Sequence, residues 1–236
     1  RLDPFVSFGQ MLPANSFVQA QAGFAAGLTA STPVDTPASG LGPVFNGESC
    51  VECHAQPTVG GASERSVSLI GGRGPAGYDP MEAHGGPLLQ VRGIVTKDCS
   101  TPGEGIPQDV VPRRRRSPAL YGAGLIEAIP EEVILARADP EDRDGDGISG
   151  RPNRVEGRLG RFGWKAHVAD LESFAARALF DELGITSPRH PVDAPPFVSV
   201  KSCDTVADPE DTGAHVAELA DFLRFLDGLP PEVLTV

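Results

Sequence analysis

The sequence has little positive charge and no long apolar run. Its 236 residues include 20 Lys and Arg against 32 Asp and Glu, a net charge of -12, and the isoelectric point is near 4.8. Such a chain is unsuited to binding nucleic acid or an anionic membrane surface. No apolar stretch approaches the roughly 18 residues that span a bilayer. We therefore predict no transmembrane segment and no nucleic-acid partner.

Aromatic residues and strand-like alternation are also scarce. Aromatic residues make up 6%, whereas 28 glycines and 23 prolines form more than a fifth of the chain, which favours irregular connections. Apolar residues recur at helical spacing in three stretches, residues 16–28, 168–184 and 212–226. These patterns predict a mostly α, loop-rich fold.

Cysteine is rare as well, with four in the chain, and two of them belong to a C-x-x-C-H motif at residues 50–54. Two thiols at this spacing can each add to one haem vinyl group, and the next histidine can then bind the iron. Zinc sites and thioredoxin-like redox pairs also use C-x-x-C, but Cys99 and Cys203 do not form a second pair. We predict one covalent haem c on Cys50 and Cys53, with His54 as the proximal ligand.

Haem attachment to such a motif takes place on the outer side of the energy-transducing membrane. We therefore predict a periplasmic or otherwise exported protein, from which an export signal has been removed or precedes the numbering. That compartment is oxidising, so Cys99 and Cys203 are expected to form a disulfide, with two free thiols as the alternative.

The sixth iron position separates an electron carrier from a catalyst. A histidine or methionine there favours electron transfer, whereas an open position allows a small molecule to bind. We favour His84, which is followed by two glycines that permit close approach of the backbone, with Met81 as the alternative. The other histidines and methionines considered are Met11, His167, His190 and His215.

Two further groups of residues are candidate cofactor contacts. Residues 113–116 are four consecutive arginines, and either they form a solvated patch or Arg115 and Arg116 neutralise haem propionates. Trp164, the single tryptophan, is either a core residue or a haem contact.

An acidic turn at residues 142–150 resembles the first half of a calcium loop. Asp142, Asp144 and Asp146 stand at positions 1, 3 and 5, and Gly147 stands at position 6. Position 12 is Asn153, where a bidentate glutamate is expected. A calcium site and a plain Asp-Gly turn both remain open.

Several segments between residues 41 and 186 occur in the order found in one protein family. They are GPVFN (42–46), HGGP (84–87), SP (117–118), GAGLIEAIP (122–130), DGDGISGRPN (144–153), GRFGWKA (160–166) and GIT (184–186). In these segments the chain resembles the N-terminal haem part of the di-haem oxidoreductases, also called thiol oxidoreductases. The resemblance implies a periplasmic, cytochrome c-like protein related to bacterial di-haem peroxidases.

Members of that family carry a second C-x-x-C-H motif in a C-terminal domain, whereas this chain has one. It is therefore either a fragment or a one-haem relative. Our preferred interpretation is a mono-haem c-type cytochrome that transfers electrons to a redox partner protein. The alternatives are the haem domain of a peroxidase-like or thiol-oxidising enzyme whose second haem lies elsewhere, and a haem-bearing subunit of a respiratory or photosynthetic membrane complex.

The predicted organisation is a single haem domain over residues 1–236. It comprises an N-terminal arm and helix (1–40), a haem-attachment segment (41–60), a long Gly/Pro-rich insertion (61–210) and a C-terminal helix (211–236). We expect the first and last helices to pack together, as in cytochrome c domains.

Overall fold

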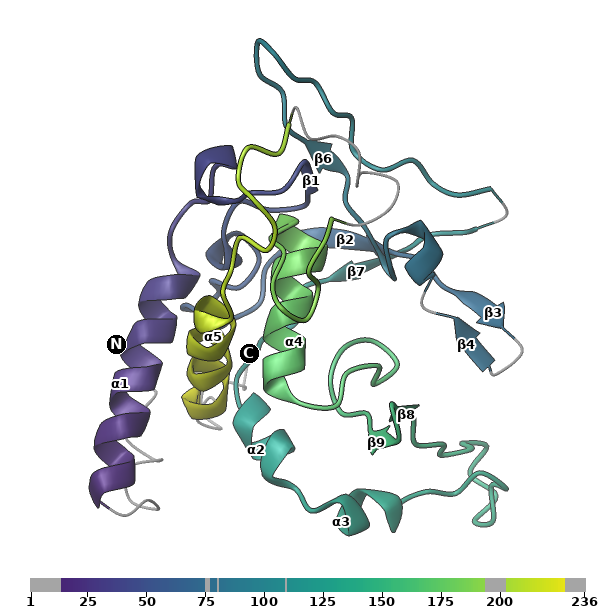
Figure 1. Ribbon diagram of the computed structural model, residues 1–236. Helices are drawn as coiled ribbons and strands as arrows, with labels where there is room; N and C mark the ends of the chain where they lie inside the picture. The colour runs from purple at the N-terminus through teal and green to yellow at the C-terminus, as the bar shows by residue number, and fades with distance from the viewer. Residues whose placement is uncertain (1–13, 75–76, 80, 109, 194–202, 228–236) are drawn as a thin grey trace.

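The computed structural model describes residues 14–74, 77–79, 81–108, 110–193 and 203–227, and Figure 1 shows the chain. Its α-helices are α1 (Ala14–Ser31), α2 (Ala123–Ala128), α3 (Glu131–Leu135), α4 (Leu171–Ala178) and α5 (Ala214–Phe225). Four short helical turns are η2 (Pro37–Ser39), η3 (Cys50–Glu52), η4 (Glu82–His84) and η5 (Leu179–Leu183). None of the described helices is long and apolar enough to cross a membrane.

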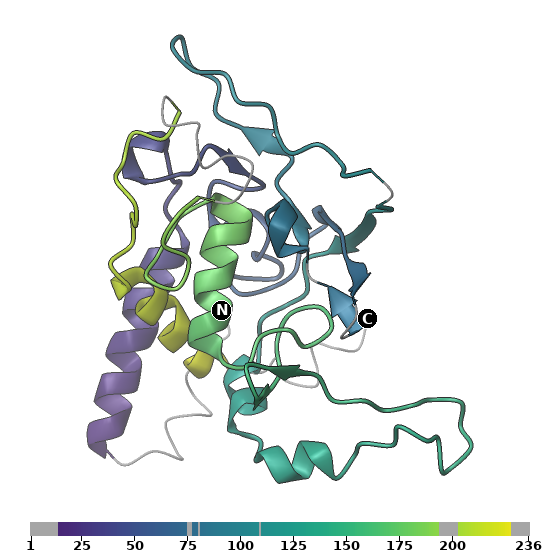
Figure 2. The ribbon, with the colours of Figure 1, turned by 45° about the vertical axis from the view of Figure 1, so that its right-hand side comes forward.

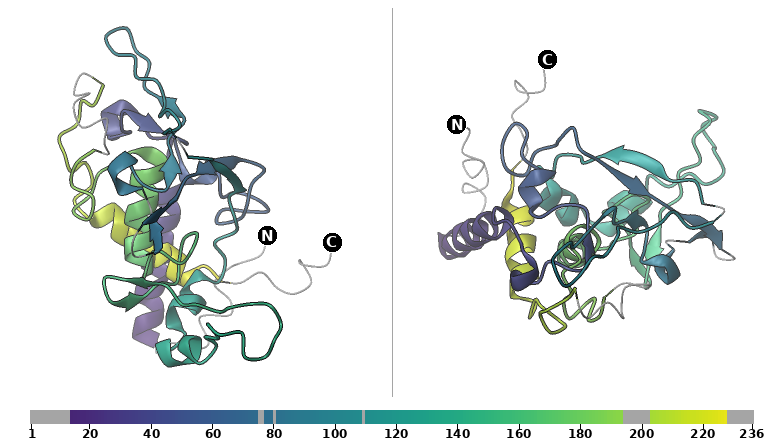
Figure 3. Two further views of the ribbon diagram at one scale, coloured as in Figure 1. Left: turned by 90° about the vertical axis from the view of Figure 1, so that its right-hand side faces the viewer. Right: turned by 90° about the horizontal axis from the view of Figure 1, so that it is seen from above.

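Helix α5 lies between α1 and α4, and the three form the helical side of the molecule (Figures 1 and 3). Helix α1 approaches α5 closely at Gly27, where a Cβ atom would overlap the backbone carbonyl of Glu218. The rings of Phe24 and Phe222 pack against each other at a tilt beside it, with centroids 5.2 Å apart. The predicted packing of the first helix on the last is therefore confirmed.

Asp170 caps the N-terminus of helix α4, because its side chain accepts a hydrogen bond from the Ser173 amide at 2.7 Å. It continues into the π-helical turn η5 and ends at Gly184, which adopts φ 70°. Leu171 and Leu179 are almost fully buried, and each contributes about 2 kcal/mol of hydrophobic stabilisation. The helix predicted over residues 168–184 is confirmed, with slightly different ends.

The described strands form four small antiparallel sheets. Strand β2 (Ser66–Leu69) lies between β5 (Leu88–Leu89) and β7 (Arg113–Arg116). The remaining pairs are β1 (Val44–Phe45) with β6 (Arg92–Gly93), β3 (Gly72–Gly74) with β4 (Gly77–Asp79), and β8 (Arg154–Val155) with β9 (Arg158–Leu159).

The expectation of a mostly α, cytochrome c-like fold is wrong. The described part of the chain holds nine strands beside its five α-helices, and these elements do not form a mostly α cytochrome fold. Strands of two to four residues are too short to produce a recognisable period-2 pattern, so sequence periodicity missed them. Within the predicted insertion, residues 61–210, helix α4 and the turn η5 contribute Ala175, Ala176, Leu179 and Leu183 to the core.

Two connections extend from the body at opposite ends (Figures 2 and 3). The segment between β6 and β7 projects at one end, and the segment between α3 and β8, which contains the acidic turn, projects at the other.

The division of the chain into a single domain with four parts stays a prediction.

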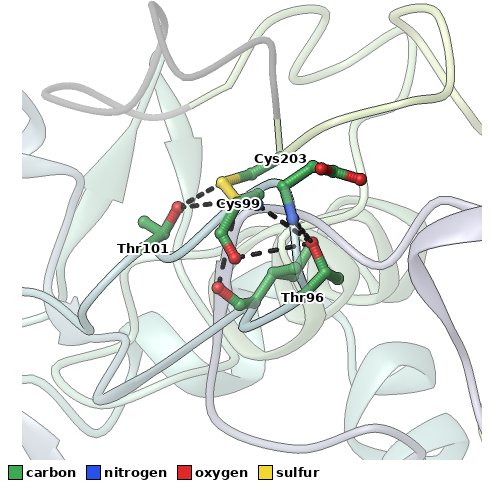
Figure 4. Close-up of a disulfide and its surroundings, with 6 residues drawn as sticks. Thr96, Cys99, Thr101 and Cys203 are labelled. Atoms are coloured by element: carbon green, nitrogen blue, oxygen red, sulfur yellow. Dashed lines mark hydrogen bonds between the residues drawn. A yellow bond between two sulfur atoms is a disulfide. The ribbon is translucent and has the colours of Figure 1, made fainter.

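The predicted disulfide between Cys99 and Cys203 is confirmed (Figure 4). Its Cα atoms are 5.3 Å apart, and it joins residues separated by 104 positions. Both cysteines are buried, and the Thr96 hydroxyl accepts a hydrogen bond from the Cys99 amide at 3.1 Å. The bridge ties the connection between β6 and β7 to the segment that leads into α5.

Candidate haem site

The C-x-x-C-H motif forms the tight turn η3 at the surface of the helical layer. The amides of Cys53 and His54 both donate to the carbonyl of Cys50, at 3.2 and 3.0 Å. This turn holds the two thiols and the imidazole on one short segment. All five motif residues are half-buried, and the two cysteines are free thiols.

The motif borders a hollow of about 440 Å³, counting its opening to solvent. Gly47, Ser49, Cys50, Cys53 and His54 line one side. The other side is formed by Ala178, Leu179, Glu182 and Leu183, from the end of α4 and from η5, together with Leu219 of α5. An apolar wall facing two thiols and an imidazole is the environment that a covalently attached haem requires.

The imidazole of His54 is held by the loop that follows it. Its Nδ1 atom lies 3.1 Å from the carbonyl oxygen of Gly61. Burial lowers the pKa of His54 and outweighs the hydrogen bonds to the Gly61 and Pro118 backbones, which raise it, so the neutral form of the ring is favoured. A ring that donates its Nδ1 proton to the Gly61 carbonyl carries its lone pair on Nε2, the atom that would bind a metal. The ring also interacts with the backbone of Pro118.

The loop itself depends on glycine at position 61. Gln56 and Ala62 pair as an antiparallel bridge, with hydrogen bonds of 2.9 and 2.7 Å between their backbones. A Cβ atom at Gly61 would overlap the carbonyl of Gln56. Glycine is therefore required for the backbone to present the Gly61 carbonyl to His54.

Charged residues fix the motif from its outer side. Glu52 accepts from the Glu48 amide at 3.1 Å and pairs with Arg65 at 2.9 Å and Arg92 at 3.7 Å. Arg92 also pairs with Glu48, and its guanidinium lies over the Phe45 ring, 4.7 Å from the centroid. Glu52 thus has a structural role in joining the turn to strand β6.

The two thiols are poor candidates for thiolate chemistry. Burial and then the charge of Asp35 raise the pKa of Cys50 to about 12. Burial and then Glu182 raise the pKa of Cys53. The raised pKa values make both thiols weak nucleophiles on their own, which argues against a redox-active pair.

Glu182 is a residue of the hollow that the sequence analysis missed. Its Oε2 atom is buried and has no hydrogen-bond partner in the part of the chain that the structure describes. Burial, followed by the neighbouring charge of Asp181, raises the pKa of Glu182 to about 7. The carboxyl group can therefore gain or lose a proton near neutral pH beside the motif. No sequence pattern identifies it, because it lies in an irregular turn after α4.

A family model described as "di-haem oxidoreductase, putative peroxidase" matches residues 96–217, just over half of the chain. The chain belongs to this di-haem oxidoreductase family. The matched segment supplies Glu182 and the apolar wall formed by α4 and η5, whereas the C-x-x-C-H motif precedes it. No curated protein and no solved structure matches the chain.

Membership of the family supports a haem-related oxidoreductase and agrees with the residues of the hollow. The apolar wall, the half-buried thiols and the oriented His54 imidazole fit a haem. The chemistry that a bound haem supplies is exchange of one electron between ferrous and ferric iron. Covalent attachment through Cys50 and Cys53 and the number of haems stay predictions.

The predicted sixth ligands, His84 and Met81, are not among the residues that line the hollow. His84 is exposed at the end of η4. This turn is nevertheless tied to α4, because Arg177 pairs with Glu82 at 2.9 Å. The structure thus places η4 beside the helix that lines the hollow, without placing either side chain in it.

The predicted cofactor contacts Arg115, Arg116 and Trp164 also lie outside the lining of the hollow. All four arginines of β7 are exposed, and Arg116 pairs with Glu64 at 2.8 Å. Trp164 is 44% exposed, so the core alternative for this residue is wrong. Its ring instead packs under the Arg115 guanidinium, 5.3 Å from the centroid.

The acidic turn brings together the side chains of Asp142, Asp144 and Asp146, whose carboxylate oxygens lie within 4.8 Å of one another. Both Asp142 oxygens accept from the Gly147 amide, at 3.1 and 3.2 Å. Asp144 and Asp146 are exposed. Calcium binding at this turn stays a prediction, because a hydrated Asp-Gly turn has the same hydrogen bonds.

Proposed function

We propose that the chain carries one covalent haem c on Cys50 and Cys53 and transfers single electrons through it. The observation that carries the proposal is the orientation of His54, whose Nδ1 atom is engaged by Gly61 while the ring borders the apolar hollow. Nε2 of His54 would bind the haem iron, and Leu179 and Leu183 of η5 with Leu219 of α5 would keep water away from the haem.

The position of the motif suits exchange of electrons with another protein. Every residue of the motif is half-buried, so an edge of the attached haem would lie near the surface. The net charge of -12 favours a redox partner with a basic docking surface, either a separate protein or a subunit of a membrane-bound complex.

We further propose that the protein works in the periplasm or another exported compartment. The buried Cys99–Cys203 disulfide supports this location, because structural disulfides persist in oxidising compartments and are rare in the cytosol. Attachment of haem to a C-x-x-C-H motif belongs to the same side of the membrane.

A peroxidase-like reaction is the second candidate, and the composition of the hollow favours it. Among the described lining residues, His54 is the single histidine and there is no methionine. An iron held by His54 alone would leave its sixth position open to a small molecule such as peroxide. Glu182 could then hold or release a proton at its Oε2 atom in the same hollow.

An optical spectrum of the purified protein tests both candidates. The reduced form is recorded with and without carbon monoxide. A low-spin c-type spectrum that carbon monoxide does not change would support the electron carrier. A high-spin component that binds carbon monoxide would replace it with the peroxidase-like enzyme. Absence of a c-type spectrum would reject both.

A further inference from the structure

Strand β7 forms one edge of the three-stranded sheet (Figure 1). In the strand order β5-β2-β7 it pairs with β2 on one side, and no described strand pairs with its other side. All four of its residues, Arg113–Arg116, are exposed arginines. They are four of the 20 Lys and Arg residues in a chain with a net charge of -12. This edge is therefore a basic surface on an acidic protein.

The described chain neutralises little of the charge on this edge. Arg116 pairs with Glu64 at 2.8 Å, where both side chains are exposed. No described carboxylate forms an ion pair with Arg113, Arg114 or Arg115. Because side chains alternate along a strand, Arg113 and Arg115 lie on one face of the sheet, and Arg114 and Arg116 lie on the other. A strand added beside β7 would thus meet guanidinium groups on both faces.

An exposed tryptophan lies next to this edge. Trp164 is 44% exposed, and its ring lies under the Arg115 guanidinium, 5.3 Å from the centroid. Charged side chains on an edge strand commonly prevent unwanted pairing, but this role does not explain an exposed tryptophan beside them. Tryptophan and arginine are enriched among the residues that dominate the energetics of protein interfaces. Their combination here indicates a docking surface.

The loop that carries Trp164 is held in an uncommon backbone conformation. Lys165 and Ala166 have left-handed φ angles of 67° and 49°, which cost free energy in residues with a Cβ atom. Asn153 stabilises the loop, because its Nδ2 atom donates to the carbonyls of Lys165 and Ala166, each at 3.1 Å. A tryptophan on a fixed loop loses little conformational freedom when a partner binds.

We propose that β7 and Trp164 bind an acidic, extended segment of a partner protein, which joins the sheet as a further strand beside β7. The outer edge of β7 supplies main-chain donors and acceptors for such a strand. Carboxylates of the segment pair with the arginines, whose guanidinium groups can bind them bidentately. A second copy of β7 is a poor partner, because arginines would then lie opposite arginines.

This surface is separate from the haem hollow, since neither Trp164 nor any residue of β7 lines the hollow. The interaction is therefore independent of whether the haem transfers electrons or reacts with peroxide. It also differs from docking of a basic redox partner, which the net negative charge of the whole chain favours.

Calorimetric titration of the purified protein with a peptide of alternating glutamate and threonine tests the proposal. Wild type should bind the peptide, with an affinity that falls as the salt concentration rises. Arg113→Gln combined with Arg114→Gln should weaken binding by about tenfold or more. The same peptide with two adjacent prolines at its centre keeps its charge but loses main-chain donors, so it should bind about tenfold more weakly or worse.

Two further variants make the test specific. Trp164→Ala should also weaken peptide binding, and it changes an exposed side chain outside the sheet. Arg143→Gln combined with Arg189→Gln removes the same charge from exposed positions elsewhere and should leave the affinity unchanged. Normal affinity in Trp164→Ala would reject the role of this residue.

The proposal is overturned if wild type does not bind the peptide, if the proline-containing peptide binds equally well, or if the two double variants weaken binding alike. Tighter binding to vesicles of anionic phospholipid than to the peptide would assign the arginines to a membrane surface instead. Self-association of wild type that the β7 double variant abolishes would assign the edge to a second copy of the chain.

Discussion

The Nδ1 atom of His54 lies 3.1 Å from the carbonyl oxygen of Gly61. This contact sets the tautomer and the direction of the imidazole that is proposed to bind iron. It depends on a glycine, since a Cβ atom at residue 61 would overlap the Gln56 carbonyl.

Gly61→Ala should therefore lower the haem content per chain, because the Gly61 carbonyl must move away from His54 to relieve the overlap. The measurement is the ratio of haem absorbance to protein after purification. Gly105→Ala is the matched control, because a Cβ atom there meets nothing within 4 Å. Equal haem content in both variants would show that the His54–Gly61 contact is dispensable.

Glu182→Gln should change the pH dependence of the haem midpoint potential. An ionised Glu182 stabilises ferric iron, and reduction raises the affinity of the carboxyl group for a proton. With the pKa of Glu182 raised to about 7, the wild-type potential should fall as pH rises through this region. The slope cannot exceed about 59 mV per pH unit for one electron and one proton.

Glu182→Gln should flatten this slope and give a higher potential than wild type above pH 7. Redox titration between pH 5 and 9 provides the measurement. Glu64→Gln serves as control, because Glu64 is exposed and pairs with Arg116. A slope that persists in Glu182→Gln would assign the proton to another group.

Replacing Cys99 and Cys203 together by serine should lower the free energy of unfolding by about 2–5 kcal/mol. The reason is that the bridge closes a long loop, with its ends 104 positions apart, and so restricts the unfolded chain. Denaturant unfolding of both proteins at equal haem loading measures the difference. Unchanged stability would mean that the bridge contributes nothing beyond the surrounding hydrogen bonds.

His84→Ala and Met81→Ala test the predicted sixth ligand. If η4 moves into the hollow when haem is bound, the variant that lacks the ligand should lose its low-spin spectrum and bind carbon monoxide. The salt bridge between Arg177 and Glu82 already holds η4 beside α4. Low-spin spectra in both variants would assign the sixth position to another residue.

The motif and the main helices could be predicted from the sequence because their signals are local. C-x-x-C-H is contiguous, and α4 and α5 repeat apolar residues along a buried face. The pairing of Cys99 with Cys203 was also predictable, since these two cysteines remained once the motif was set aside.

The strands and part of the hollow could not be predicted, because they depend on contacts between distant segments. Strand β2 pairs with a run of four arginines, which has no strand pattern of its own. Glu182 reaches the motif only through the packing of η5, and Trp164 lies under Arg115 rather than in the core.

Covalent attachment of haem to Cys50 and Cys53 is the central claim, and extraction with acidified organic solvent tests it most directly. The account predicts that the haem stays with the protein, that the peptide containing residues 50–54 carries its mass, and that replacing both cysteines by serine releases it. Complete extraction of haem from the wild-type protein, or purification of correctly exported protein without haem, would contradict the claim.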